Sequence, residues 1–338
     1  MDPLNADRRP ARADGSRVDV PRPVAREAGL ARAVAAQGWA VLPGALDATA
    51  TARSAAALDE VFAAEDDIAR ARRWRTAGYR VAYMLPAKHP ELLALCRPGR
   101  LSRAAAEVLG EGCVVAAFNG LAVVPGGEAQ PLHRDHLELT PGVTLYLHAV
   151  VALDRFTTAN GATLVVPGTH LEPGSADAPD GPAQVTAAGR ARTGGGPAQA
   201  TGAGRARTGG GPAQATGAGR TGPVAGSGGP EPSIDDVSPT MPTAQDRAVA
   251  VELEPGDALV YDATCLHAAG ANTSEAPRRA LHVLFARRWV QPLWDFPASL
   301  RPQDAARLDE ATRRLLGFDN APARYDHAAR RAFGSGWG

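Results

Sequence analysis

Helical and strand-like hydrophobic patterns occupy different parts of the chain. Near the N-terminus, apolar residues recur at helical spacing over 23–37, and Asp47 can cap a second helix that ends near residue 64. Two further helices are predicted over about 100–109 and 302–316, and each is followed directly by a glycine that can end it. The predicted helices therefore flank a middle region whose pattern is different.

Short apolar runs separated by Gly, Pro, Asn and Asp dominate residues 112–290. Asn160 and Gly161 are typical of a turn between two such runs. Strand spacing without intervening helices predicts an antiparallel sandwich or barrel. The fold class is therefore mainly β with flanking helices, and helices on both sides of the β region favour a cupin-like jelly roll.

A Gly/Ala/Pro-rich tract interrupts the β-rich region over residues 173–245. It contains a 15-residue repeat that begins at Gly181, and each copy has almost nothing apolar to bury. The tract is predicted to be a disordered surface insertion; a flexible lid or tether is the alternative. Residues 1–22 are predicted to be a disordered tail. One domain is expected over 23–300, followed by a C-terminal helix and tail over 301–338.

Charge and composition narrow the class of partner. The 36 basic and 36 acidic residues balance, and no basic stripe suggests a nucleic acid. No apolar run reaches the roughly 18 residues of a membrane helix, and the N-terminus lacks the apolar core of a secretory signal. Cys96, Cys113 and Cys265 form no CxxC pair, which favours a reducing compartment. We therefore expect a cytoplasmic protein without a membrane or nucleic-acid partner; the oligomeric state stays open.

Candidate metal chemistry is concentrated in the segment QPLHRD. On an extended chain, His133 and Asp135 project from the same face, so an imidazole and a carboxylate can reach one metal ion. His267, which follows the run GDALVYD, would complete the two-His-one-carboxylate set that leaves open positions on non-haem Fe(II). Arg278 could bind a cosubstrate carboxylate through its planar guanidinium. Taken singly, these residues also fit a polar surface strand and a solvated strand edge.

The segments QPLHRD, NGATLVVPGTH and GDALVYDATCLHAAGANTSEAPRRAL resemble the phytanoyl-CoA dioxygenase family of Fe(II)/2-oxoglutarate oxygenases. The resemblance covers about 35–290 without the repeat tract, and is closest to the branch that tailors microbial secondary metabolites. It implies a double-stranded β-helix with Fe(II) held by His133, Asp135 and His267. It also implies that Arg278, in preference to the adjacent Arg279, holds the distal carboxylate of 2-oxoglutarate.

Two further residues are cosubstrate candidates by the same resemblance. Gln130 matches a glutamine that contacts 2-oxoglutarate in some related enzymes. Thr163 is predicted to be a pocket or cosubstrate contact, and a turn-flanking β-branched residue is an equal alternative. His148 and His282 lie in apolar strands and are predicted to be hydrogen-bonded core or sheet-face histidines. Arg80, Tyr83, Met84 and Asn119 are candidates for substrate contacts, with a structural role favoured for each.

The resemblance implies a dioxygenase that consumes O2 and 2-oxoglutarate and releases succinate and CO2. Hydroxylation of a C–H bond in a small-molecule natural-product intermediate is the default outcome; desaturation, epoxidation, ring expansion and endoperoxidation are open. The carboxylate of Asp135 argues against halogenation, which needs a small non-ligating residue there. Two other classes remain: a cupin-like metalloenzyme that does not use 2-oxoglutarate, and a non-catalytic binding protein built on the β core.

Overall fold

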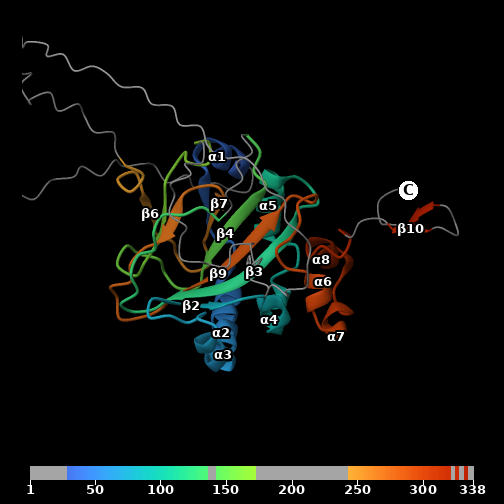
Figure 1. Ribbon diagram of the computed structural model, residues 1–338, viewed down its shortest axis with the longest axis horizontal. Helices are drawn as coiled ribbons and strands as arrows, with labels where there is room; N and C mark the ends of the chain where they lie inside the picture. The colour runs from blue at the N-terminus through green and yellow to red at the C-terminus, as the bar shows by residue number, and fades with distance from the viewer. Residues whose placement is uncertain (1–28, 136–141, 173–242, 321–323, 327–330, 334–338) are drawn as a thin grey trace, which may run out of the picture. The chain divides into compact units, whose positions relative to one another are not determined.

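The computed structural model describes residues 29–135, 142–172, 243–320, 324–326 and 331–333 (Figure 1). The predicted tail over 1–22 and nearly all of the predicted insertion over 173–245 lie outside the described residues, as do the first residues of the predicted helix over 23–37. The fold can therefore be followed through the helices that precede the β region, through the β region on both sides of the tract, and into the C-terminal helices.

Two antiparallel sheets form the core of the described chain. The larger sheet has six strands in the order β1-β7-β4-β9-β3-β2, and the smaller has three in the order β6-β5-β8. The bounds in the larger sheet are β1 (Trp39–Leu42), β7 (Ala258–Asp262), β4 (Tyr146–Ala152), β9 (Arg278–Ala286), β3 (Val114–Val123) and β2 (Tyr79–Ala82). Those in the smaller sheet are β6 (Val249–Val251), β5 (Thr163–Val165) and β8 (His267–Ala269).

The two sheets pack face to face. Val150 of β4 and Leu259 of β7 share one buried apolar cluster with Val165 of β5 and Val251 of β6. Successive strand residues point to opposite faces, so alternate residues of the larger sheet line the space between the sheets. This face is called the inner face below. Two facing antiparallel sheets joined by long crossings are the jelly roll that the strand pattern predicts.

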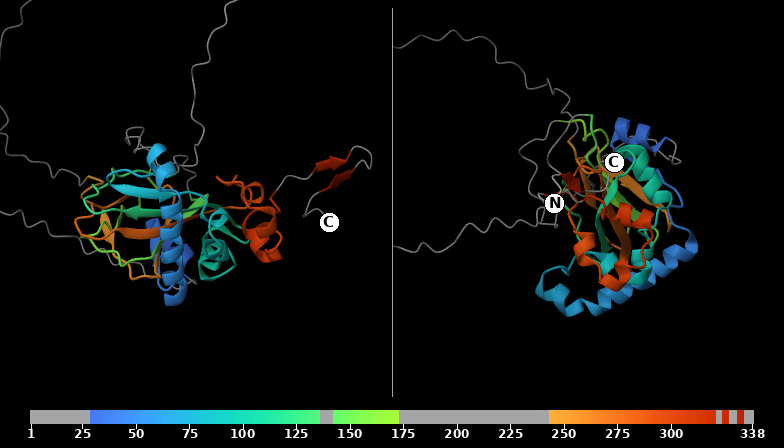
Figure 2. Two further views of the ribbon diagram at one scale, coloured as in Figure 1. Left: turned by 90° about the horizontal axis from the view of Figure 1, so that it is seen from below. Right: turned by 90° about the vertical axis from the view of Figure 1, so that its right-hand side faces the viewer.

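Helices cover the other, outer face of the larger sheet (Figures 1 and 2). Leu281, Val283 and Phe285 of β9 are buried in one cluster with Leu58 and other helical residues. The helices are α1 (Leu30–Gln37), α2 (Ala48–Ala64), α3 (Asp66–Ala71), η1 (Leu85–Ala87), α4 (Pro90–Ala94), α5 (Arg100–Leu109), α6 (Phe296–Ser299), α7 (Pro302–Ala305) and α8 (Glu310–Leu315). A short pair, β10 (Arg324–Asp326) and β11 (Arg331–Phe333), follows them.

A glycine in β3 leaves room for a leucine side chain of helix α2. A Cβ atom on Gly120 would stand 2.3 Å from Cδ1 of Leu58, far inside van der Waals contact. A side chain at this position would therefore require the Leu58 side chain to move. The absence of a side chain at Gly120 therefore allows the close packing that buries Leu58 completely.

Most predicted elements are confirmed, and one is wrong in a way that local chemistry explains. Asp47 caps α2 by accepting a hydrogen bond from the backbone N–H of Ala50, and α5 spans the predicted residues 100–109. The single helix predicted over 302–316 is instead two short helices, α7 and α8. Asp309 begins α8 by accepting a hydrogen bond from the N–H of Thr312, because an N-cap aspartate favours a new helix start over a continued helix.

Among the described residues, no helix is both long and apolar enough to cross a membrane.

Candidate metal centre and cosubstrate pocket

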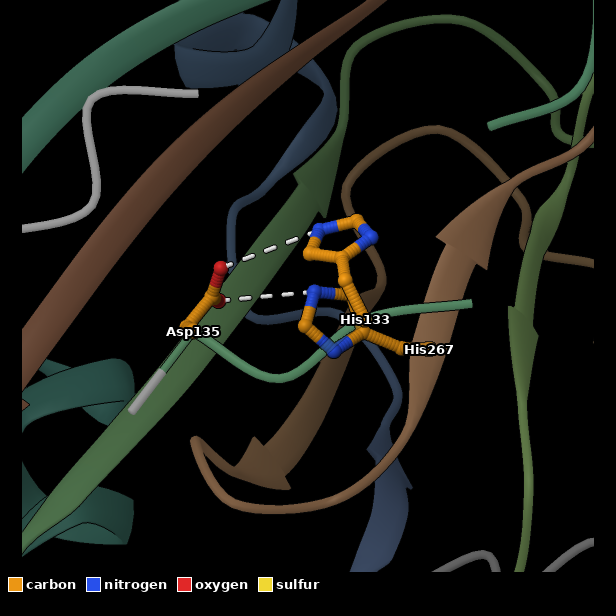
Figure 3. A group of neighbouring side chains, drawn as sticks. All are labelled: His133, Asp135 and His267. Atoms are coloured by element: carbon orange, nitrogen blue, oxygen red, sulfur yellow. Dashed lines mark ion pairs between the residues drawn. The ribbon is translucent and has the colours of Figure 1, made fainter. Parts of the chain in front are cut away.

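His133, Asp135 and His267 converge at one point on the inner face. One ligand atom from each lies within 4.8 Å of the other two (Figure 3). Nε2 of His267 is 3.4 Å from Oδ2 of Asp135, and Nε2 of His133 is 4.0 Å from Oδ1. His133 and Asp135 therefore project toward the same point, as expected from their two-residue spacing, and His267 lies beside them.

Backbone hydrogen bonds hold these three residues in place. His133 and His267 form an isolated antiparallel bridge in which each N–H donates to the other residue's carbonyl oxygen, at 2.9 and 3.0 Å. The N–H of Asp135 donates to the carbonyl oxygen of Ala263 at 3.0 Å. Segments far apart in the sequence are thus joined through the main chain, and side-chain convergence follows from that pairing.

Both imidazoles are hydrogen-bonded through Nδ1, which leaves Nε2 of each ring as the candidate metal ligand. Nδ1 of His133 lies 2.9 Å from the carbonyl oxygen of Pro131, and Nδ1 of His267 lies 3.0 Å from that of Cys265. A carbonyl oxygen only accepts, so each Nδ1 carries a proton, and in the neutral ring each Nε2 presents a lone pair. Nε2 of His133 is buried and has no partner among the described residues. Metal-ligating histidines are held in the same way, with Nδ1–H donating to a carbonyl oxygen and Nε2 directed at the metal position.

The charges of the group also suit a cation. Burial raises the pKa of Asp135, but His267 and His148 outweigh it and hold the pKa of this carboxyl well below its usual range. Burial and the neighbouring His267 lower the pKa of His133. Burial lowers the pKa of His267 as well, but the Asp135 carboxylate reverses the shift and raises it. An ionised carboxylate beside two imidazole Nε2 atoms is the donor set that Fe(II) takes, and a metal ion would replace the proton that the carboxylate favours on Nε2 of His267.

Arg278 is a buried cation in the same cavity. It begins β9, is 1% exposed, and its guanidinium carbon lies 4.1 Å from the ring centroid of Phe156. Its Nε and Nη1 atoms have no hydrogen-bond partner in the described part of the chain. Burial lowers the pKa of Arg278 to about 10, although Asp154 opposes that shift, so the group stays charged at neutral pH. A buried, unpaired guanidinium calls for an anion.

The adjacent Arg279 has a different environment. Its guanidinium contacts Asp154 at 2.7 Å and Asp59 at 2.6 Å, so its charge is already paired. Only Arg278 lines the cavity that contains His133, Asp135 and His267. The structure thus places the two arginines as the sequence interpretation expects, with the first inside and its neighbour outside.

Both remaining sequence candidates also line this cavity. Thr163, on β5, is 6% exposed. Oε1 of Gln130 accepts a hydrogen bond from the N–H of Ala269 at 3.0 Å, which orients the side chain and leaves its amide nitrogen as the available donor. The complete lining is Leu121, Gln130, His133, Asp135, His148, Val150, Thr163, Tyr261, His267, Ala268, Ala269, Arg278 and His282.

Three polar cavity residues were not predicted as site residues: His148, Tyr261 and His282. Nδ1 of His148 is 2.6 Å from Oδ2 of Asp135, and the Tyr261 hydroxyl donates to the same oxygen at 3.3 Å. His148 and His282 are hydrogen-bonded strand histidines, as predicted, but they face the cavity. Strand alternation carries the missed signal, because His282 lies four residues after Arg278 and therefore shares its face.

None of the four candidates for substrate contacts, Arg80, Tyr83, Met84 and Asn119, is among the residues that line the cavity. Arg80 pairs with Asp66 at 2.8 Å and lies over the Phe62 ring, which is a structural role. Asn119 is paired with His282 across β3 and β9. Its Oδ1 accepts from the N–H of Met84 at 3.2 Å and from Trp294 Nε1 at 3.3 Å, so it ties β3 to two other segments beside the cavity. Tyr83 packs between Trp74 and Trp294.

A jelly roll with a His–Asp–His group and a buried arginine on its inner face defines the class of 2-oxoglutarate-dependent non-haem iron dioxygenases. The chain belongs to the phytanoyl-CoA dioxygenase family, whose sequence model matches residues 34–280. This match spans most of the chain, including every candidate ligand. The donor set described above, with Arg278 in the same cavity, fits Fe(II) and 2-oxoglutarate.

The curated relative described here has low sequence identity to this chain. The multifunctional dioxygenase prhA of Penicillium brasilianum is 25% identical over 213 residues, which are 60% of this chain and 52% of that protein. The chain thus spans about half the length of this curated relative.

Two of the solved structures to which this chain is similar are described with alpha-ketoglutarate (2-oxoglutarate). The alpha-ketoglutarate-dependent carbocyclase SnoK from nogalamycin biosynthesis has a TM-score of 0.48 at 18% identity, over 78% of this chain and 87% of SnoK. HygX from Streptomyces hygroscopicus, with nickel and 2-oxoglutarate bound, has a TM-score of 0.48 at 15% identity, over 80% and 89% of the two chains.

Proposed function

We propose that this dioxygenase hydroxylates a C–H bond of a small-molecule, natural-product biosynthetic intermediate. In this proposal His133, Asp135 and His267 hold Fe(II), and Arg278 holds the distal carboxylate of 2-oxoglutarate. The observation that supports it most is the unpaired guanidinium of Arg278 inside the cavity of the His–Asp–His group. A metal site alone would not need a buried cation nearby, but a site for a dicarboxylate bound to the metal would.

Fe(II) and 2-oxoglutarate, when bound, supply the oxidising chemistry, with O2 consumed and succinate and CO2 released. The chain's own residues would bind and orient the metal ion and 2-oxoglutarate. The unpaired Nε and Nη1 of Arg278 can each donate to an oxygen of a bound carboxylate, and the Phe156 ring packs against the guanidinium. The low dielectric of a buried site strengthens these charge-assisted hydrogen bonds.

Gln130 and Thr163 complete the cosubstrate site in this proposal. The Gln130 side chain is fixed by the Ala269 N–H, so its amide nitrogen can donate without further ordering. Thr163 offers a hydroxyl from the opposite sheet, because β5 belongs to the three-stranded sheet. Both residues line the same cavity as Arg278.

The substrate class and location extend the same proposal. The motifs that resemble the secondary-metabolite branch support a natural-product intermediate, and hydroxylation is the default of the family chemistry. Asp135 keeps a carboxylate where halogenation would need a small side chain, which supports oxygen insertion. The absence of CxxC pairing among three buried cysteines is in keeping with a cytoplasmic location.

The decisive experiment needs no substrate. Purified protein is loaded with Fe(II) without oxygen and titrated with 2-oxoglutarate, and the visible iron-to-cosubstrate charge-transfer band is recorded. We expect a saturable band that is weakened in Arg278→Ala and unchanged in the matched control Arg279→Ala. Iron binding without a band would favour the cupin-like alternative. Failure to bind iron would favour a non-catalytic β-core protein.

A further inference from the structure

A second cavity lies on the outer face of the larger sheet. Its volume is about 190 Å³, and it shares no lining residue with the cavity of His133, Asp135 and His267. Three neighbouring strands, β3, β4 and β9, supply one wall, through Val115, Phe118, Val151, Leu281, Val283 and Phe285. Residues 94–97 and 99–102, from the end of α4 into α5, contribute to the opposite wall. The sheet itself therefore separates the two cavities.

The inner part of this second cavity suits an apolar group better than water. Its six strand side chains are apolar, and each is at most 5% exposed. A buried water needs about two to four polar partners, which such a wall does not offer. An engineered cavity of about 150 Å³ lined by Leu, Ile and Phe stays dry and binds benzene. By that comparison, this cavity can hold an apolar group of about six to eight carbon atoms.

Two arginines mark the open end of the second cavity. Arg97 is exposed and Arg100 is half-buried, whereas the strand residues are buried, so the cavity runs inward from the arginines to the sheet. Nη1 of Arg100 donates to the carbonyl oxygen of Gly44 at 3.0 Å, which holds this side chain in place. No other described residue that lines the cavity is charged. The open end is therefore positive and suits an anion.

One acidic residue interacts with this end of the cavity from outside. The pKa of Asp309 is lowered chiefly by its hydrogen bonds with Thr312, and more weakly by the charge of Arg97. Asp309 is not among the lining residues, so it does not take the place of an anion inside the cavity.

We propose that the second cavity binds a monocarboxylic acid with an aliphatic or aromatic body. The body lies against β3, β4 and β9, where its apolar surface is removed from water, and the carboxylate lies at Arg97 and Arg100. The site is distinct from the metal group, and the inference does not rest on the proposed function, because neither the candidate ligands nor Arg278 take part.

The test uses octanoate as the probe and 1-octanol as its uncharged counterpart of equal length. Each is titrated by calorimetry into the purified full-length protein, and we expect saturable binding of about one octanoate per chain. Val283→Phe places a larger side chain inside the cavity and should abolish saturable binding of both probes.

Two sets of arginine variants locate the carboxylate. The double variant Arg97→Gln/Arg100→Gln should bind octanoate about tenfold more weakly and octanol equally well, because it loses a charge-assisted hydrogen bond. The matched control Arg103→Gln lies on α5 as well but outside the lining, and it should leave both affinities unchanged. Arg278→Ala should also leave octanoate binding unchanged, because Arg278 lies in the other cavity.

The absence of saturable octanoate binding by the unsubstituted protein overturns the inference, and so does binding of several octanoates per chain. Loss of binding in Arg278→Ala with retention in Val283→Phe overturns it too, because the acid would then occupy the cavity of the metal group. An octanoate affinity that is the same in Arg97→Gln/Arg100→Gln as in Arg103→Gln removes the anion site. The arginine variants change only the open end, so they decide the question even if Val283→Phe does not fold.

Discussion

Arg278 and Arg279 are neighbours in one strand, and their environments are opposite. Arg279 has its charge paired by Asp154 and Asp59, and the residues that follow on the outer face pack against helices. Arg278 is almost fully buried with two nitrogens unpaired, and His282 on the same inner face repeats this pattern. Buried polar groups are ordinarily paired, so unpaired ones mark places where a ligand completes the site. Residues on the outer face contribute to stability by packing against helices, whereas the inner face has unpaired polar atoms that a ligand could bind.

The largest effect is expected from Asp135→Ala on the inner face. This change removes the carboxylate that faces the Nε2 atoms of His133 and His267, so we expect loss of stoichiometric Fe(II) binding and of succinate formation. Anaerobic iron titration and a succinate assay measure both. The exposed Asp246→Ala is the matched control and should behave as the unsubstituted protein. Undiminished turnover in Asp135→Ala would remove Asp135 from the ligand set.

The two arginines provide the sharpest form of the comparison. Arg278→Ala should weaken 2-oxoglutarate binding about 100-fold, because a buried bidentate charge pair is lost. Arg279→Ala should leave that affinity unchanged and lower the free energy of unfolding by about 1 kcal/mol, the usual worth of partly exposed ion pairs. Cosubstrate titration and urea unfolding separate the two results. Equal affinities in both variants would contradict the assignment of Arg278.

On the outer face, Leu281→Ala tests stability alone. Leu281 is 1% exposed within the helix-covered cluster, so its truncation should lower the free energy of unfolding by about 2–5 kcal/mol. The folded fraction should still bind 2-oxoglutarate with unchanged affinity, because the side chain points away from the cavity. Urea unfolding followed by cosubstrate titration under native conditions checks both expectations. A large loss of affinity would mean that the two faces are not independent.

The smallest effect concerns thiol reactivity. Cys113 and Cys265 are buried, and burial raises the pKa of each thiol to about 11. Thiolate is the reactive form, so its population is small at pH 8 and increases as the pH approaches that value. The native protein should react slowly with a thiol reagent at pH 8 and fully once unfolded. Rapid labelling of the native protein would show that these thiols are accessible.

The candidate metal ligands could be predicted from the sequence, but the residues that contact them could not. His133, Asp135, His267 and Arg278 could be predicted, because a two-residue spacing fixes a shared face and the motifs resemble one family. His148 and Tyr261 could not be connected to Asp135 in the same way. Their contacts depend on the pairing of β4 with β7 and on the position of the 133–135 segment, which a single sequence does not supply.

Helix boundaries show the same division between local and tertiary signals. Asp47 signals its own helix start, since the cap acts within three residues. The break between α7 and α8 is also local: Asp309 interrupts a run whose apolar spacing would allow one continuous helix. Periodicity predicted that run, and the capping signal of Asp309 was the competing rule that prevailed.

The reciprocal backbone bridge between His133 and His267 has a consequence for how this protein can vary. The two histidines are fixed to each other by main-chain hydrogen bonds, so their separation in space does not depend on the number of residues between them. Loop-closure entropy grows only slowly with loop length. Segments between the two histidines can therefore lengthen or shorten over generations while the spacing of the ligands stays constant.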